Sequence, residues 1–204
     1  MIIGALLAGA ISLAGCAIPS SKPLVSAPPS ASADDFIYVS DVAGRIRALR
    51  SDGTQHWSYS LADDLAQAAD VASHDLHIDF LTARSAGKLF GLATVESGRF
   101  AGRKILFALD GNRLLWHREA PPPEPGTAPI AVGGNAVYEA SDDGSLYAFA
   151  RADGRPMWQY RVSNGTLGSP VVGADGTIYV TGPGFNLHAI APDGSQRWVI
   201  GTGK

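Results

Sequence analysis

A motif of about 40 residues recurs along the chain, and this repetition constrains the fold more than any other feature. In three copies an apolar, strand-like segment is followed 20, 21 and 20 residues later by a tryptophan. With a fourth, more distorted copy, the repeat is marked by Trp57, Trp116, Trp158 and Trp198, at spacings of 59, 42 and 40 residues. A period near 40 in a strand-rich sequence is typical of β-propeller blades and not of helical solenoids. The sequence therefore predicts an all-β propeller with about four blades.

Each copy has the same internal order of strands and turns. An alternating strand, a turn, a second strand and an Asp-Gly pair lead to the strand that contains the tryptophan. Asp-Gly supplies the positive φ angles of a two-residue hairpin turn, and the pairs are Asp52-Gly53, Asp110-Gly111, Asp153-Gly154 and Asp193-Gly194. With short apolar segments at 128–132 and 169–172 as inner strands, the blades are expected at about 36–60, 76–120, 128–165 and 169–204.

Two places depart from the repeat. Residues 61–75 are rich in alanine and aspartate, and we interpret them as an inserted loop with some helical character. They are followed by an alternating segment at 76–83, which is expected to be the inner strand of the second blade. The first blade has no convincing inner strand, because Pro29–Ala33 stand in its place.

The fourth copy carries a specific family resemblance. The string from Ser169 to Val180, continued by Leu187–Ile190 and by Asp193-Gly194 up to Trp198, resembles the repeat of PQQ (pyrroloquinoline quinone)-like β-propellers. The likeness is strong over 128–204, good over 36–60 and loose over 89–120. It implies that the tryptophan of each blade docks against the neighbouring blade, so the four tryptophans are expected to be structural. It also points to the bacterial envelope lipoproteins of this family, one role of which is the assembly of outer-membrane β-barrel proteins.

The four expected blades are too few for a complete ring, since the resemblance implies rings of about six to eight blades. Three explanations stay open. The chain is a fragment or a truncated gene product, or two chains pair to make one ring, or the protein is a true open arc or four-bladed ring. We therefore expect a partial or open ring, with self-association as one way to complete it.

The N-terminal region predicts a cellular address. Residues 1–15 are apolar and uncharged, and Leu13-Ala14-Gly15-Cys16 resembles a bacterial lipobox. The resemblance implies cleavage before Cys16, the only cysteine, and acylation there, which would give stable membrane anchoring. Residues 16–35 are rich in Pro, Ser and Ala and are expected to be a flexible tether. An uncleaved membrane anchor stays open, since about 17 apolar residues are the lower limit for spanning, and so does an ordinary secretory signal. No Lys or Arg precedes Lys22, which departs from the usual start of a signal peptide. The residue that follows Cys16 is Ala17 and not Asp, and this resembles the outer-membrane sorting pattern of Gram-negative lipoproteins.

Few residues indicate chemistry. The net charge of −3 gives no support for nucleic-acid binding. The resemblance implies that PQQ enzymes carry a vicinal cysteine pair, and a chain with a single cysteine cannot form one. We therefore expect neither PQQ nor another cofactor. His77 and Asp79 would share one face of a strand and are the weak candidates for a metal site, although a polar strand edge is the preferred interpretation. Catalytic residues are not discernible, and we expect no enzyme activity.

The combined hypothesis is a non-enzymatic, lipid-anchored propeller that acts as a protein-interaction scaffold in the bacterial envelope, in the outer membrane facing the periplasm. Its expected partners are envelope proteins, and the membrane through the lipid. The alternative is a quinone- or carbohydrate-binding or sensing module, or a truncated fragment of a PQQ-type enzyme.

Overall fold

A computed structural model of the chain describes residues 30–31, 36–69, 76–83, 88–96, 101–120, 130–141, 143–163 and 165–201. The expected signal peptide, Cys16 and most of the expected tether lie outside these ranges. Within them, no helix has both the length and the apolar character needed to cross a membrane.

The described strands form four antiparallel sheets of four strands each, and in every sheet the strands lie side by side in chain order. Sheet 1 contains β1 (Ser30–Ala31), β2 (Ile37–Ser40), β3 (Arg45–Leu49) and β4 (Gln55–Ser60). Sheet 2 contains β5 (Leu76–Ala83), β6 (Lys88–Val95), β7 (Lys104–Asp110) and β8 (Arg113–Glu119). Sheet 3 contains β9 (Ala131–Gly133), β10 (Ala136–Ala140), β11 (Ser145–Ala150) and β12 (Pro156–Arg161). Sheet 4 contains β13 (Val171–Val172), β14 (Ile178–Gly182), β15 (Asn186–Ile190) and β16 (Gln196–Gly201), with the short 3-10 helix η2 (Pro183–Phe185) between β14 and β15.

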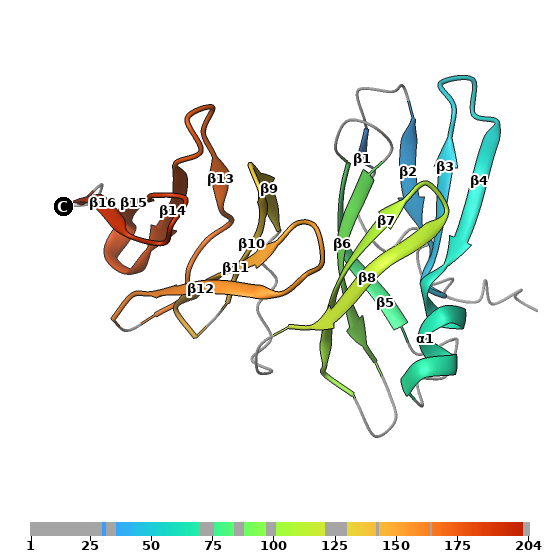
Figure 1. Cartoon of the computed structure of the whole chain (residues 1–204), viewed down its shortest axis with the longest axis horizontal. Helices are drawn as coiled ribbons and strands as arrows, with labels where there is room; N and C mark the ends of the chain where they lie inside the picture. Colours follow the sequence, from blue (N-terminus) through green and yellow to red (C-terminus); the bar gives the residue numbers. More distant parts are fainter. Residues whose placement is uncertain are drawn as a thin grey trace, which may run out of the picture.

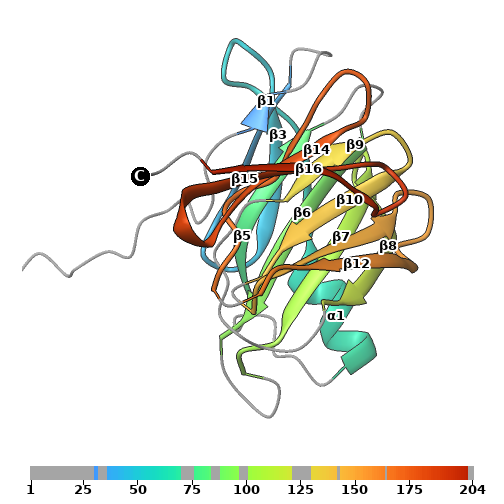
Figure 2. The same cartoon turned by 90° about the vertical axis from the view of Figure 1, so that its left-hand side faces the viewer.

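The sheets follow one another in chain order, with sheet 1 and sheet 4 at opposite ends (Figure 1). Seen from the side of sheet 4, the other sheets lie behind it (Figure 2). This arrangement confirms the predicted fold class, an all-β propeller type with about four blades in a ring that is not closed.

Three apolar cores lie between successive sheets, because each inner sheet is apolar on both faces. Core 1 joins sheets 1 and 2 through residues such as Tyr38, Ile46 and Phe107. Core 2 joins sheets 2 and 3 through Phe90, Trp116 and Val137. Core 3 joins sheets 3 and 4 and is described in detail below. The outer faces of sheets 1 and 4 have no further sheet against them in the described part of the chain.

Two local features differ from the sequence interpretation. The first blade does have an inner strand, since Ser30 and Ala31 pair with Tyr38 and Ile37; proline before this pair does not prevent two residues from pairing at a sheet edge. The segment expected to be an inserted loop with helical character forms helix α1 (Leu61–Ala69). The hydroxyl of Ser60 accepts a bond from the amide of Asp63 at 3.2 Å and so caps the helix. Leu61, Ala62 and Leu65 are buried in core 1, which anchors the insertion.

Candidate interaction surfaces

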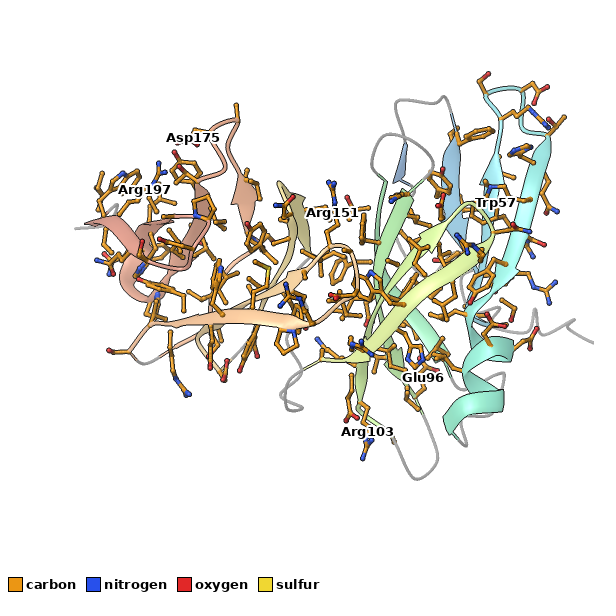
Figure 3. All side chains as sticks on the ribbon, in the orientation of Figure 1. Trp57, Glu96, Arg103, Arg151, Asp175 and Arg197 are labelled. Atoms are coloured by element: carbon orange, nitrogen blue, oxygen red, sulfur yellow. The ribbon has the colours of Figure 1, made fainter. Side chains whose placement is uncertain are left out.

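The sheets are joined by a recurring contact in which an indole rests on the Asp-Gly turn of the next sheet. The indole Nε1–H of Trp116 in β8 donates to the carbonyl oxygen of Arg151 at 3.0 Å. Forty-two residues later, Trp158 in β12 donates in the same way to the carbonyl oxygen of Pro192 at 2.9 Å. We call this contact the Trp–turn joint; Arg151 lies between sheets 2 and 3 (Figure 3).

Glycine is required in the turn that receives the indole. A Cβ atom at Gly154 would lie 2.5 Å from Cε3 of Trp116, and one at Gly194 would lie 2.7 Å from Cδ2 of Trp158. Both glycines also have a positive φ, of 70° and 89°, which other L-residues adopt only at a cost of about 1–2 kcal/mol. The glycine therefore serves both the turn and the packing of the neighbouring sheet.

The receiving turns are longer than the sequence predicts. Only Gly111-Asn112 forms the expected two-residue loop, between the paired residues Asp110 and Arg113. In sheets 1 and 4 a three-residue loop is closed by backbone bonds from Arg50 to Thr54 and from Ala191 to Ser195, next to a β-bulge. The turn of sheet 3 is one residue longer still, with its bond from Ala150 to Arg155. This extra length directs a backbone carbonyl outward, toward the preceding sheet, where an indole can reach it.

The two remaining tryptophans are not in such joints. Trp57 packs against core 1, but a Cβ at Gly111, in the tight turn of sheet 2, would meet no atom within 4 Å. Trp198 in β16 is 38% exposed. Neither indole donates a hydrogen bond to another described residue. They lie in the two end sheets of the row, and Figure 3 labels Trp57 at one end and Arg197, next to Trp198 in the chain, at the other.

Every tryptophan has an aromatic partner within its own sheet, which the sequence analysis did not identify. The ring centroids of these pairs are 5.7 to 6.2 Å apart and the rings are tilted; the pairs are Tyr38–Trp57, Phe90–Trp116, Tyr138–Trp158 and Tyr179–Trp198. Such pairs add to the stability of a sheet. The pairing holds each indole in place from within its own blade, whether or not a neighbour receives it.

Exposed apolar side chains gather on sheet 4. Of the seven large hydrophobic residues that are exposed in the described chain, five belong to sheet 4 or its loops: Val171, Phe185, Trp198, Val199 and Ile200. Phe185, in η2, is the most exposed at 78% and has a φ of 59°, a left-handed conformation unusual for a bulky residue. Exposed and strained aromatic residues of this kind are candidate contacts for a partner.

The metal candidates have other partners. Asp79 lies at a β-bulge of β5 and accepts a bond from the hydroxyl of Thr94 at 2.6 Å, while burial raises the pKa of its carboxyl group. The ring of His77 lies 3.8 Å from the carboxylate of Glu96. No group of three or more His, Cys, Asp or Glu side chains that could hold a metal ion occurs among the residues that the structure describes. His77 and Asp79 are here part of a polar network at the end of sheet 2.

A groove of about 280 Å³ lies between sheets 3 and 4 and is lined by Tyr160, Asn186, His188 and Gln196, among others. The Tyr160 hydroxyl contacts Nδ1 of His188 at 2.8 Å and donates to Gln196 at 2.7 Å. Nε2 of His188 has no partner, and a Cβ at Gly182 would lie 2.7 Å from it. The imidazole is thus packed against backbone, and burial lowers its pKa. Through Tyr160 it connects sheet 4 with sheet 3.

One buried acid lies at the joint between sheets 2 and 3. Glu139 in β10 is 5% exposed, and its Oε2 has no hydrogen-bond partner. Burial raises the pKa of its carboxyl group to about 7, against a smaller opposing effect of Lys104. No sequence pattern marks this residue as buried, because a glutamate in an alternating strand is usually solvent-exposed.

The fold and these joints define a segment of β-propeller whose blades are linked by tryptophans. A family model described as "Outer membrane protein assembly factor BamB" matches residues 102–203, and the chain belongs to this family of PQQ-like propeller repeats. No curated protein sequence matches the chain.

Solved structures of low sequence identity share the fold. The crystal structure of BamB from Moraxella catarrhalis has a TM-score of 0.61 and 16% identity, over 85% of this chain and 48% of that one. A protein of unknown function from Bacteroides caccae has a TM-score of 0.59 and 12% identity, over 87% of this chain and 61% of that one. The chain therefore spans about half to three fifths of the length of these structures.

Proposed function

We propose that this chain is a non-enzymatic scaffold that binds other proteins in the bacterial envelope and is held at the membrane by a lipid on Cys16. The family description supports an association with the outer membrane, and the Leu13-Ala14-Gly15-Cys16 stretch supports the anchor. Residues 16–35 would then serve as the tether that lets the propeller reach its partners.

The observation that carries the scaffold proposal is the exposed Phe185 on sheet 4. Aromatic side chains dominate the binding energy of many protein interfaces, because they bury a large area with few rotatable bonds. Phe185 belongs to the loop between β14 and β15, and its backbone holds a left-handed conformation that costs stability. A folded protein that leaves an aromatic side chain 78% exposed at such a cost fits selection for binding better than selection for stability.

Cross-linking in intact cells tests this proposal. A photoreactive phenylalanine analogue would replace Phe185, and the same analogue at Asn112, an exposed position in the β7–β8 turn, would be the control. We expect a discrete cross-linked protein from position 185 and none from position 112. Recovery of the uncoupled chain alone from position 185 would contradict the proposal.

Two further measurements test the anchor and the absence of catalysis. The Cys16→Ser variant should move from the membrane fraction to the soluble fraction, or stay unprocessed in the inner membrane.

Addition of PQQ and calcium to the purified chain should leave its thermal midpoint unchanged. A bound chromophore or a clear thermal shift would favour the cofactor-binding alternative over the scaffold.

A further inference from the structure

We infer that a second copy of this chain covers the exposed face of sheet 4, and that it does so with its own sheet 1, so that two chains close one ring head to tail. The inference concerns assembly and does not depend on the proposed scaffold function or its partners. The joint between sheets 3 and 4 of the same chain provides the template.

In that template, one face of sheet 3 packs on one face of sheet 4. Tyr138, Ala148 and Trp158 lie in register across sheet 3 and contribute to core 3. From the other side, sheet 4 contributes Ile178, Val180 and Ile190, all buried in the same core. Trp158 then completes the joint on the Asp193-Gly194 turn.

The outer face of sheet 4 repeats the first half of this template. Its register places Tyr179, Ala189 and Trp198 opposite one another, as Tyr138, Ala148 and Trp158 are in sheet 3. Val171 extends the row on the inner strand, and Ile200 lies two residues beyond the tryptophan on the same face. Val171 is 62% exposed and Ile200 is 55% exposed, so this face is apolar and no other described sheet covers it.

The outer face of sheet 1 repeats the second half. Ile37 pairs with Leu49 as Ile178 pairs with Ile190 in sheet 4. Val39 takes the position of Val180 in the same comparison. Ile37 is 38% exposed, and Val39 and Leu49 are half-buried. The row that is buried in sheet 4 is thus present in sheet 1 without a neighbouring sheet against it.

The receiving turn is also present in sheet 1. The amide of Gly53 bonds the carbonyl of Arg50 at 2.9 Å, as Gly194 bonds Ala191 at 2.9 Å. Asp52 accepts bonds from the amide and hydroxyl of Thr54, as Asp193 does from Ser195.

The unused turn has the space that an indole needs. Gly53 has a φ of 82°, and a Cβ placed on it would meet nothing within 4 Å. Ser51 occupies the position of Pro192, the residue whose carbonyl oxygen accepts the Trp158 bond. Trp198 of one copy therefore fits over Gly53 of the second copy and donates to the carbonyl oxygen of Ser51.

One contact of the template would be missing. Ile200 and Arg47 take the places of Tyr160 and His188, so the tyrosine–histidine hydrogen bond has no counterpart. The Arg47 guanidinium forms a salt bridge with Asp41 at 3.0 Å. The aliphatic part of the Arg47 side chain could then contact Ile200 of the other copy. We therefore expect the joint between copies to be weaker than the joint within the chain.

The length of the chain agrees with closure by two copies. The chain aligns with 48% of the length of BamB from Moraxella catarrhalis, so two copies together have about the extent of one such propeller. A head-to-tail contact that closes after two copies makes a two-fold dimer in which both joints are used. A contact that failed to close would instead build open chains of growing length.

Sedimentation equilibrium of the full chain in a density-matched, mild detergent tests the proposal. We expect a dimer for the wild type in the micromolar range. Trp198→Ala should weaken it at least about 30-fold, as expected for a buried aromatic anchor. Gly53→Asn should do the same, because its side chain would occupy the space of the indole. Gly111→Asn is the matched control: it also has a positive φ and open space, but lies outside the joint, so its dimer should persist.

Mixing the two defective variants gives the sharpest result. The Trp198→Ala variant retains the Gly53 turn, and the Gly53→Asn variant retains the Trp198 indole. A mixture of the two should therefore form a dimer through one intact joint, although neither variant dimerises alone. A monomeric wild type would overturn the proposal and leave the face of sheet 4 to a different occupant. A dimer insensitive to both substitutions, or a mass that increases without limit, would also overturn it.

Discussion

Trp158 and Trp198 occupy the same position of the same repeat, 40 residues apart, yet only Trp158 is in a joint. Each has a tyrosine partner within its sheet at nearly the same distance, 5.7 and 5.8 Å. Trp158 donates to Pro192 in the next sheet, whereas Trp198 has no described sheet beyond it. The comparison shows that a blade determines the position of its own indole, while the neighbour determines whether that indole is used.

Trp57 and Trp116 extend this lesson to the turn. Both belong to blades with a sheet on the following side, but Trp116 meets the long turn of sheet 3, whereas no indole lies on Gly111 in the two-residue turn of sheet 2. An Asp-Gly pair is present in both receiving turns. The length of the loop around the pair therefore decides whether a carbonyl can accept the indole.

The largest expected effect comes from removing an indole that is in a joint. Trp116 is 6% exposed, so Trp116→Ala should lower the free energy of unfolding by about 3–5 kcal/mol. Trp198→Ala, at a dilution where the chain is monomeric, should lower it by only about 1 kcal/mol, because less area is buried. Urea denaturation of both variants measures the difference. Equal losses would mean that the joints do not contribute to stability as described.

The next prediction separates the steric clash with the indole from the backbone strain of the turn. Gly194→Ala adds both the strain of a positive φ and a contact of 2.7 Å with Trp158, so a loss of about 2–4 kcal/mol is expected. Gly53→Ala, at a dilution where the chain is monomeric, adds only the strain, about 1–2 kcal/mol, because no atom of the same chain lies within 4 Å of its Cβ. The double variant with Trp158→Phe would show whether the excess at position 194 depends on the indole. An excess that persisted without the indole would contradict the clash.

The fold itself could be predicted from the sequence to a large extent. The regular distance from each apolar strand to its tryptophan indicates blades, because strand pairing and turn positions repeat with it. The inner strand at Ser30–Ala31 was missed because two residues beside prolines give no periodic signal. Helix α1 was only partly anticipated, since its stability comes from Leu61 and Leu65 in core 1 and not from its own short sequence.

The candidate surfaces could be predicted less well. Asp-Gly indicates a turn, but the length of the turn depends on β-bulges that no local pattern marks. The burial of Glu139 depends on the approach of sheet 2, whose Lys104 lies 35 residues earlier in the chain. The exposure of Phe185 likewise depends on how sheet 4 is covered. These properties arise between blades, whereas the sequence signal lies within them.

The buried interface between sheets 2 and 3, which contains Glu139, should also make the stability of the chain depend on pH. The raised pKa of Glu139, about 7, means that the folded chain holds this proton more tightly than the unfolded chain. Stability should therefore fall as the pH rises from about 4.5 to about 7 and then level off. Glu139→Gln should remove a loss of about 2–3 kcal/mol between pH 5 and pH 8. Denaturation at both pH values measures this, with the exposed Glu119→Gln as control; an unchanged pH profile in Glu139→Gln would contradict it.

The smallest expected effect concerns the aspartates of the turns, and it should be the same with and without an indole. Hydrogen bonds from the Thr54 side chain lower the pKa of Asp52, and those from Ser195 lower the pKa of Asp193, with backbone bonds adding to both. These bonds close within each turn. Asp52→Asn and Asp193→Asn should therefore cause similar, small decreases in the urea midpoint at pH 7, because the amide oxygen still accepts the bonds but lacks the charge. The decreases should be full above about pH 4 and should be lost progressively as the pH falls from the ordinary carboxyl value of 3.8 through the lowered pKa of the folded chain. A clearly larger effect at Asp193 would mean that Trp158 also stabilises the turn that receives it, and that the turn of sheet 1 is not fully formed until an indole covers it.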